Sequence, residues 1–205
     1  MKLSEHLLAA GIDCPDDVKD TEVTNIVTSS EKVVRGSLFI CIEGERYDGH
    51  DFIKCAKDAG ASVIVARHVC DDCVGGAAII LVDNTRRAAA LLYNAYYGNP
   101  CGKLKIIGIT GTNGKTSTAF MLRSLFEGCG VRCGLIGTLG AYLDGGREIE
   151  YPKSSHLANM TTPDAEGLYF ALSKMAEEGI EYVVMEVSSH ALSQCRTDEI
   201  GRAHV

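Results

Sequence analysis

The chain has 205 residues, a formal net charge of −7, and 46% hydrophobic and 23% charged residues. This composition is typical of an ordinary globular protein of one or two domains. The acidic balance argues against a nucleic-acid partner, which would need a basic face, but not against a nucleotide held in one local site.

The start of the chain and its apolar runs give no sign of a leader or a membrane segment. No basic region precedes a long apolar core, and no stretch approaches the ~18 apolar residues of a membrane span. We therefore expect a cytoplasmic protein without membrane insertion, whose nine cysteines are reduced. Cys70 and Cys73 form a C-x-x-C pair, but no second pair or histidine pair at ligand spacing supports a zinc site.

The first 98 residues are predicted to form one mixed α/β unit, because short apolar runs alternate with segments of helical spacing. Gly60 and the Gly98-Asn99-Pro100 sequence are stop signals for two of the helices. We place the domain boundary between Gly98 and Gly102. The expected elements are strands at 37–42, 61–66 and 77–82 and helices at 51–59 and 84–97.

A second α/β unit is predicted from residue 103 onward, and its alternating strands and helices indicate a parallel sheet with right-handed crossovers. Thr162 is expected to cap a helix in which Pro163 takes the first position. Three strands leave the sheet unfinished, so we expect an open apolar edge after Val187 and a unit prone to associate. The expected elements are strands at 105–109, 133–137 and 181–187 and helices at 115–127 and 164–178.

A glycine-rich loop joins the first strand and the first helix of this second unit, and it reads Thr110-Gly111-Thr112-Asn113-Gly114-Lys115-Thr116. The glycines let backbone N–H groups approach phosphate oxygens, and the helix N-terminus adds positive potential. Lys115 can reach β- and γ-phosphates, and the Thr116 hydroxyl can bind Mg²⁺. Ile109 stands where the strict Walker pattern has glycine, so the loop is a variant. A plain glycine turn before a helix is the alternative interpretation.

Glu186 ends the third predicted strand of the second unit. Because the carboxyl ends of parallel strands meet at one edge of a sheet, this carboxylate is expected to face the phosphate loop and to hold Mg²⁺ there. An exposed strand-end glutamate is the alternative interpretation. His190, four residues further on, can be a base or a structural histidine.

Four motifs of the second unit resemble the Mur ligase family. Residues 108–116 are similar to its ATP loop, and segments 135–140, 161–164 and 185–192 follow in its order and spacing. Together they look like the branch of the family that adds the third residue of the peptidoglycan stem peptide. The segment 185–192, Met-Glu-Val-Ser-Ser-His-Ala-Leu, is the most specific of them. The first unit resembles the family's uridine-nucleotide domain in residues 36–39 and 48–53.

The resemblance implies a set of site residues, with Lys115 and Glu186 in the catalytic roles and Mg²⁺ between Thr116 and Glu186. The first unit departs from the family, because Ser29 and Glu31 flank Ser30 where aspartate and arginine are usual. In the second unit, Met160 directly precedes Thr161-Thr162-Pro163, where the family often has asparagine or histidine. ATP is expected to contact Gly111, Thr112, Asn113, Gly114, Lys115, Thr116 and Ser117, the muramoyl dipeptide Thr161, Thr162, Ser188, Gln194 and Arg196, and the uridine diphosphate Thr28, Ser30 and His50.

The expected domains are a uridine-substrate domain at 1–98, the first half of a P-loop parallel-sheet ATP-binding domain at 103–198, and a tail at 199–205. The tail, Glu-Ile-Gly-Arg-Ala-His-Val, does not continue the family pattern and equals the translation of a common sequencing adapter, so we interpret it as non-native. A divergent natural terminus is the alternative. The family's carbamylated lysine, second-metal histidine and amino-acid-binding domain have no match in residues 1–198, so we expect this chain alone to be inactive.

For the whole enzyme the resemblance implies an ATP-dependent ligation by a monomer. The D-glutamyl carboxylate of UDP-N-acetylmuramoyl-L-alanyl-D-glutamate becomes an acyl phosphate, and the amine of diaminopimelate or lysine displaces the phosphate. Two alternatives stay open. One is another Mur-type ligase, which acts on folate or on a later stem peptide. The other is a P-loop nucleotide-binding protein without ligase chemistry.

Overall fold

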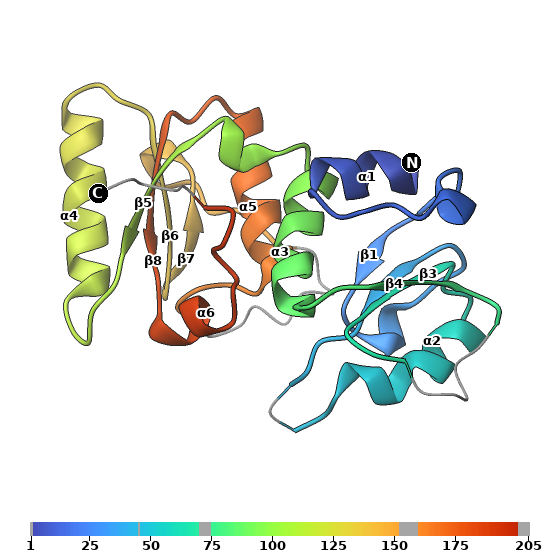
Figure 1. Ribbon diagram of the computed structural model, residues 1–205. Coiled ribbons are helices and arrows are strands. Elements are labelled where there is room, and N and C mark those ends of the chain that lie inside the picture. Colours follow the sequence, from blue (N-terminus) through green and yellow to red (C-terminus); the bar gives the residue numbers. More distant parts are fainter. Residues whose placement is uncertain (1, 45, 70–74, 152–159, 201–205) are drawn as a thin grey trace. The chain divides into compact units, whose positions relative to one another are not determined.

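The computed structural model describes residues 2–44, 46–69, 75–151 and 160–200 (Figure 1). The chain divides into two compact units, Met1–Tyr96 and Tyr97–Val205. The C-x-x-C pair of Cys70 and Cys73 and the last five residues of the expected tail lie outside the described residues.

The first unit is built on a parallel sheet in the order β1-β2-β3-β4. The three strands expected here are present, each shorter than its apolar run, and the two-residue strand β1 was too short to be expected. The strands are β1 (Ile26–Val27), β2 (Leu38–Ile40), β3 (Val63–Ala66) and β4 (Ala78–Leu81). The helices and 3-10 turns are α1 (Leu3–Ala9), η1 (Asp16–Val18), η2 (Ser30–Lys32), η3 (Gly49–Phe52), α2 (Ile53–Asp58) and α3 (Thr85–Tyr96).

Side-chain caps mark the start of two helical segments of the first unit, η3 and α3. The helix expected at 51–59 starts earlier, as the 3-10 turn η3, because the Asp48 carboxylate accepts a hydrogen bond from the His50 N–H. In the same way the Asn84 side chain accepts the Arg87 N–H at 3.0 Å at the start of α3. Further along α3, the buried Tyr93 hydroxyl donates to the Ile26 carbonyl in β1 at 3.2 Å, which ties the helix to the sheet.

The sheet of the second unit has four strands in the order β5-β8-β6-β7, where three parallel strands were expected. The last strand, β8, pairs in parallel with β5 on one side and β6 on the other. The expected open edge after Val187 is therefore wrong for β8, because the crossover inserts this strand into the middle of the sheet. The short strand β7 is antiparallel to β6 and was not expected. The strands are β5 (Lys105–Ile109), β6 (Cys133–Gly137), β7 (Gly140–Tyr142) and β8 (Tyr182–Glu186).

Helices cover both faces of this second sheet, with α4 on one side and α5 on the other (Figure 1). Asp164 caps α5 by accepting the Gly167 N–H at 2.9 Å, so the expectation that Thr162 caps this helix is wrong. An N-cap residue directly precedes the first helical residue, and Thr162 lies two residues too early. The helices and turns are η5 (Pro100–Gly102), α4 (Lys115–Gly128), η6 (Asp144–Gly146), α5 (Ala165–Glu177) and α6 (Ser189–Ser193).

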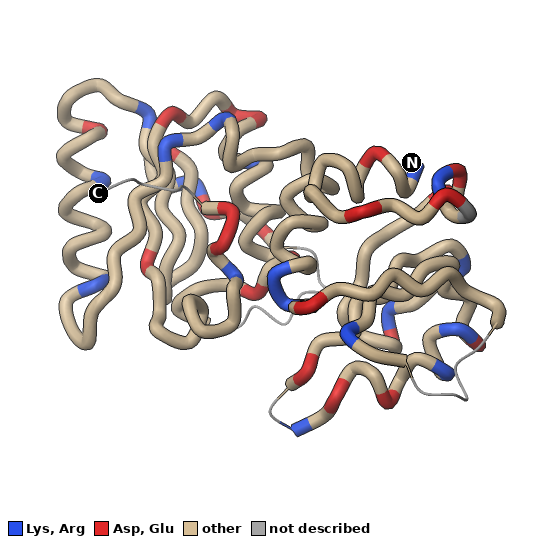
Figure 2. The backbone as a smooth tube through the Cα atoms, viewed as in Figure 1, with Lys and Arg blue, Asp and Glu red and all other residues tan. Residues whose placement is uncertain are grey.

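Charged residues of both signs are interspersed along each unit in Figure 2. In the part of the chain that the structure describes, no helix has the length and apolar character needed to cross a bilayer.

Candidate active site

The phosphate loop connects β5 to α4, and its residues 111–114 are exposed, as is Ser117. Gly111 and Gly114 have φ values of +146° and +80°, which residues other than glycine rarely adopt. Ile109 replaces the Walker glycine because it still belongs to the sheet. It lies opposite Glu186, and its carbonyl accepts the Val187 N–H at 2.8 Å. The turn therefore starts after Ile109, and Lys115 folds back over it, with Nζ donating to the Gly111 carbonyl at 2.8 Å.

Glu186 ends β8 beside this loop, and its side chain is turned inward, with the residue only 1% exposed. One carboxylate oxygen, Oε2, accepts the Thr116 hydroxyl at 2.9 Å. The alternative of an exposed strand-end glutamate is therefore wrong. Among the described residues no Lys, Arg or His forms an ion pair with this carboxylate. A buried carboxylate that is held by neutral donors alone is costly unless a cation joins it.

Two residues that received no role from the sequence, Gly137 and Thr138, complete the surroundings of Glu186. The Thr138 N–H donates to Glu186 Oε1 at 3.0 Å, and its hydroxyl lies 3.3 Å from Oε2. A Cβ on Gly137 would lie 2.2 Å from Oε1, so the carboxylate occupies the space that glycine leaves. Both residues stand at the carboxyl end of β6, next to β8, so the rule that singled out Glu186 could also have found them.

The residues expected to hold the muramoyl dipeptide lie together next to Glu186. The buried Thr162 hydroxyl donates to the Glu186 carbonyl at 2.9 Å and accepts the Ser188 N–H at 3.0 Å. Arg196 donates to the Thr162 carbonyl at 3.0 Å and to Gln194 Oε1 at 2.9 Å. Thr161 reaches the same group through Thr138, with the two hydroxyl oxygens 3.2 Å apart. One hydrogen-bonded network thus joins the phosphate loop to these five residues.

His190, the histidine four residues after Glu186, is exposed in α6 and does not contact Glu186 among the described hydrogen bonds. Its Nε2 lies 2.6 Å from the Gln194 side-chain nitrogen. An amide nitrogen can only donate, so the ring nitrogen accepts this hydrogen bond. His190 therefore helps to orient Gln194.

The first unit contains a cavity of about 550 Å³ at the carboxyl ends of β1 and β2. Thr28 and Ser30, both expected to contact uridine diphosphate, line it, and so do Ser29 and Glu31. Aromatic rings form part of the wall, since Tyr47 and Phe52 meet edge to face with their centroids 6.5 Å apart. The lining residues are Thr28, Ser29, Ser30, Glu31, Phe39, Ile42, Tyr47, Gly49 and Phe52.

His50, the third residue expected to contact the uridine nucleotide, does not line this cavity and lies buried among polar groups instead. Its Nδ1 is 2.6 Å from Asp48 Oδ1, and its Nε2 accepts the Arg67 N–H at 3.0 Å. Burial alone would raise the pKa of Asp48, but the hydrogen bonds from His50 outweigh it and hold this pKa below its usual range. The role of His50 toward a nucleotide stays a prediction.

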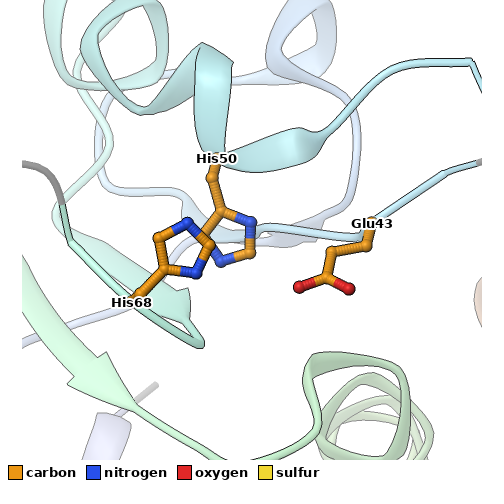
Figure 3. A group of neighbouring side chains, drawn as sticks. All are labelled: Glu43, His50 and His68. Carbon is orange, nitrogen blue, oxygen red and sulfur yellow. The ribbon is translucent and has the colours of Figure 1, made fainter.

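Glu43, His50 and His68 gather close enough to suggest a metal site, with one ligand atom of each within 4.8 Å of the others (Figure 3). The two rings are stacked, with centroids 4.2 Å apart and planes at 11°. Imidazole lone pairs lie in the ring planes, so parallel stacked rings do not converge on one ion. Both nitrogens of His50 are also engaged, and the cation of Arg67 lies 3.5 Å from Glu43. This arrangement disfavours a metal ion.

Comparison with known proteins matches both units to Mur ligase models. The model of the Mur ligase family, catalytic domain, matches residues 22–97, and that of the Mur ligase middle domain matches residues 109–205. The protein named UDP-N-acetylmuramoyl-L-alanyl-D-glutamate--2,6-diaminopimelate ligase is 41% identical over 91% of this chain in Bacillus licheniformis and 41% identical over 99% in Bacillus velezensis. The chain covers only 35% and 38% of those two proteins.

Solved structures show the same fold. A structure of a ligase with that same name matches all of this chain and 42% of its own, with a TM-score of 0.74 at 23% identity. The MurF ligase from Thermotoga maritima in complex with ADP matches 88% of this chain and 35% of its own, with a TM-score of 0.51 at 24% identity.

Proposed function

The chain belongs to the Mur ligase family. We propose that it carries the part that binds ATP and the muramoyl dipeptide in a ligase that adds the third stem-peptide residue. The whole enzyme joins 2,6-diaminopimelate to UDP-N-acetylmuramoyl-L-alanyl-D-glutamate, the reaction for which the relatives are named. The chain spans 35–38% of the length of those relatives, so this activity is proposed for the complete protein. The observation that carries the proposal is the network from Thr116 through Glu186 to Thr161 and Thr162.

The residues of the phosphate loop fit ATP and Mg²⁺. Gly111 and Gly114 have positive φ and no side chain, so phosphate oxygens could approach the backbone of the loop at these two positions. A hydroxyl and a carboxylate, from Thr116 and Glu186, lie 2.9 Å apart, and oxygen atoms of these two kinds are the ligands that Mg²⁺ prefers. A divalent cation would also balance the charge of the buried Glu186.

When bound, Mg·ATP supplies the γ-phosphoryl group that converts the D-glutamyl carboxylate into an acyl phosphate, which the incoming amine can attack. Lys115 would leave the Gly111 carbonyl and neutralise phosphate charge. Thr116 and Glu186 would hold Mg²⁺. The dipeptide would be oriented by Thr161, Thr162, Ser188, Gln194 and Arg196. Their fixed positions would reduce the entropic cost of bringing the reactants together.

The test is the affinity of the 205-residue protein for Mg·ATP, measured by calorimetry with and without Lys115→Ala. Losing the charge-assisted contacts costs about 1.5–3 kcal/mol, which is about ten- to a hundredfold in Kd. Lys174→Ala is the matched control, because that lysine pairs with Glu177 on the surface of α5 and should leave the affinity unchanged. Equal affinity in the wild-type and Lys115→Ala proteins would contradict the proposal.

A further inference from the structure

Thr138 makes three polar contacts at the centre of the network, and although it lies in the family-like segment 135–140, it received no role from the sequence. Its N–H donates to Glu186 Oε1 at 3.0 Å, and its hydroxyl oxygen lies 3.3 Å from Glu186 Oε2 and 3.2 Å from the Thr161 hydroxyl. It is the first residue after β6, and so it stands at the carboxyl end of the strand next to β8. Both oxygens of the Glu186 carboxylate are therefore held from this one residue.

The direction of these hydrogen bonds follows from counting protons. An ionised carboxylate only accepts, and a threonine hydroxyl has a single proton to donate. When Thr138 donates that proton to Glu186, its oxygen still accepts, and the hydroxyl of Thr161 is the donor that lies within reach. The result is a chain of donors from Thr161 to Thr138 to Glu186.

Among the described residues, one other side chain donates a hydrogen bond to this carboxylate. The Thr116 hydroxyl also donates to Oε2, but in the proposed function Thr116 must share its oxygen with Mg²⁺. Gly137 has no Cβ and so leaves space for the carboxylate beside β6, but it has no side chain that could hydrogen-bond to the carboxylate. Among the contacts described for the Glu186 carboxylate, only those of Thr138 reach both oxygens. They come from its N–H and its hydroxyl, which are not Mg²⁺ ligands in the proposed function.

We propose that Thr138 is a positioning residue, which turns the Glu186 carboxylate toward the metal and is itself braced by Thr161. This inference rests on the proposed function, because it assumes that Glu186 holds Mg²⁺. It adds a residue that acts through Glu186 and does not touch the metal or the nucleotide. Removing its hydroxyl should change the response to Mg²⁺ more than the affinity for ATP without metal.

The experiment titrates ATP into the 205-residue protein at a series of Mg²⁺ concentrations. Thr138→Val keeps the shape and the backbone N–H but removes the hydroxyl, and Thr138→Ser restores it. A hydrogen bond to an ionised carboxylate corresponds to about ten- to a hundredfold, so we expect Thr138→Val to need that much more Mg²⁺ for half of its effect on ATP affinity. Thr138→Ser should match the wild type, and Thr161→Val should shift the Mg²⁺ requirement in the same direction by a smaller factor.

Controls separate this inference from the proposed function. Ser124→Ala removes an exposed hydroxyl on α4 and should change nothing. If Glu186→Gln raises the Mg²⁺ requirement while Thr138→Val behaves as the wild type, the positioning role is wrong and the proposed function stands. If the wild type shows no Mg²⁺-dependent ATP binding, the proposed function fails and this inference fails with it. An equal loss of affinity for ATP with and without Mg²⁺ in Thr138→Val would indicate a merely structural role.

Discussion

At the scale of single residues, the site depends on how a buried charge is accommodated. Glu186 is 1% exposed, and its carboxylate fits only because Gly137 has no side chain. Gly137 is not among the glycines with positive φ, so its backbone would accept another residue. The requirement for glycine at this position therefore comes from space beside the carboxylate and not from backbone strain.

Gly137→Ala should consequently displace the Glu186 carboxylate. The new Cβ would lie 2.2 Å from Oε1, and overpacking of this kind typically costs about 1–3 kcal/mol of unfolding free energy. We also expect the Mg²⁺ dependence of ATP binding to weaken, which calorimetry at two Mg²⁺ concentrations would show. Gly128→Ala is the control, because a Cβ there meets nothing within 4 Å. Unchanged Mg²⁺ dependence in Gly137→Ala would mean that the carboxylate tolerates a shift.

At the scale of elements, helix α1 carries a buried histidine that its sequence pattern does not explain. His6 is 5% exposed, with its ring centroid 6.0 Å from that of Tyr96 in α3, and its Nε2 has no hydrogen-bond partner among the described residues. Burial lowers the pKa of His6 from its usual value, although the nearby Glu5 opposes this effect. The packing of α1 on α3 therefore favours a neutral ring.

The stability of this helix pair should accordingly fall in mild acid. In the unfolded chain His6 takes up a proton near pH 6.5, whereas in the folded state it resists protonation until a lower pH. Its contribution is thus complete above pH 6.5 and is lost as the pH falls from there toward the folded pKa. Urea unfolding followed by circular dichroism at pH 7 and pH 5 should show a larger fall for wild type than for His6→Leu. Equal falls would mean that His6 does not titrate in this window.

At the scale of the whole molecule, the chain consists of two units that each have a sheet and a core of their own. The cavity of the first unit is lined by hydroxyl groups and aromatic rings, which suits a nucleoside, but also by the Glu31 carboxylate, which would repel a diphosphate. The departures noticed at Ser29 and Glu31 in the sequence therefore fall on the cavity wall.

Residues 1–98 made separately should fold and bind uridine diphosphate weakly, and Ser29→Asp combined with Glu31→Arg should strengthen that binding. Replacing a repelling carboxylate by a guanidinium that can pair with phosphate is worth about 1.5–3 kcal/mol, or about ten- to a hundredfold in Kd. Calorimetric titration gives the comparison. Glu22→Arg, an exposed charge change away from the cavity, should have no effect. Unimproved binding would show that this motif is aligned wrongly with the family.

The sequence by itself determined the two α/β units, the phosphate loop and the family, because each depends on local signals. Strand β5 and strand β6 coincide with their apolar runs, and α4 begins at the lysine that follows the glycine turn. The edge at which Glu186 lies followed from the general rule for parallel strands. The roles of the individual site residues stay predictions.

Only the tertiary structure decided how the strands are ordered and what surrounds Glu186. Pairing of β8 between β5 and β6 joins segments far apart in the chain, and periodicity within one segment carries no information about such a partner. The strand-end rule could have placed Gly137 and Thr138 at the same edge as Glu186, but only the structure shows that they contact its carboxylate, almost fifty residues further on. Thr162 shows how a tertiary contact can override a local pattern. Its position near the helix start suits a cap, but its hydroxyl instead donates to the Glu186 carbonyl and accepts the Ser188 N–H. Asp164 caps the helix in its place.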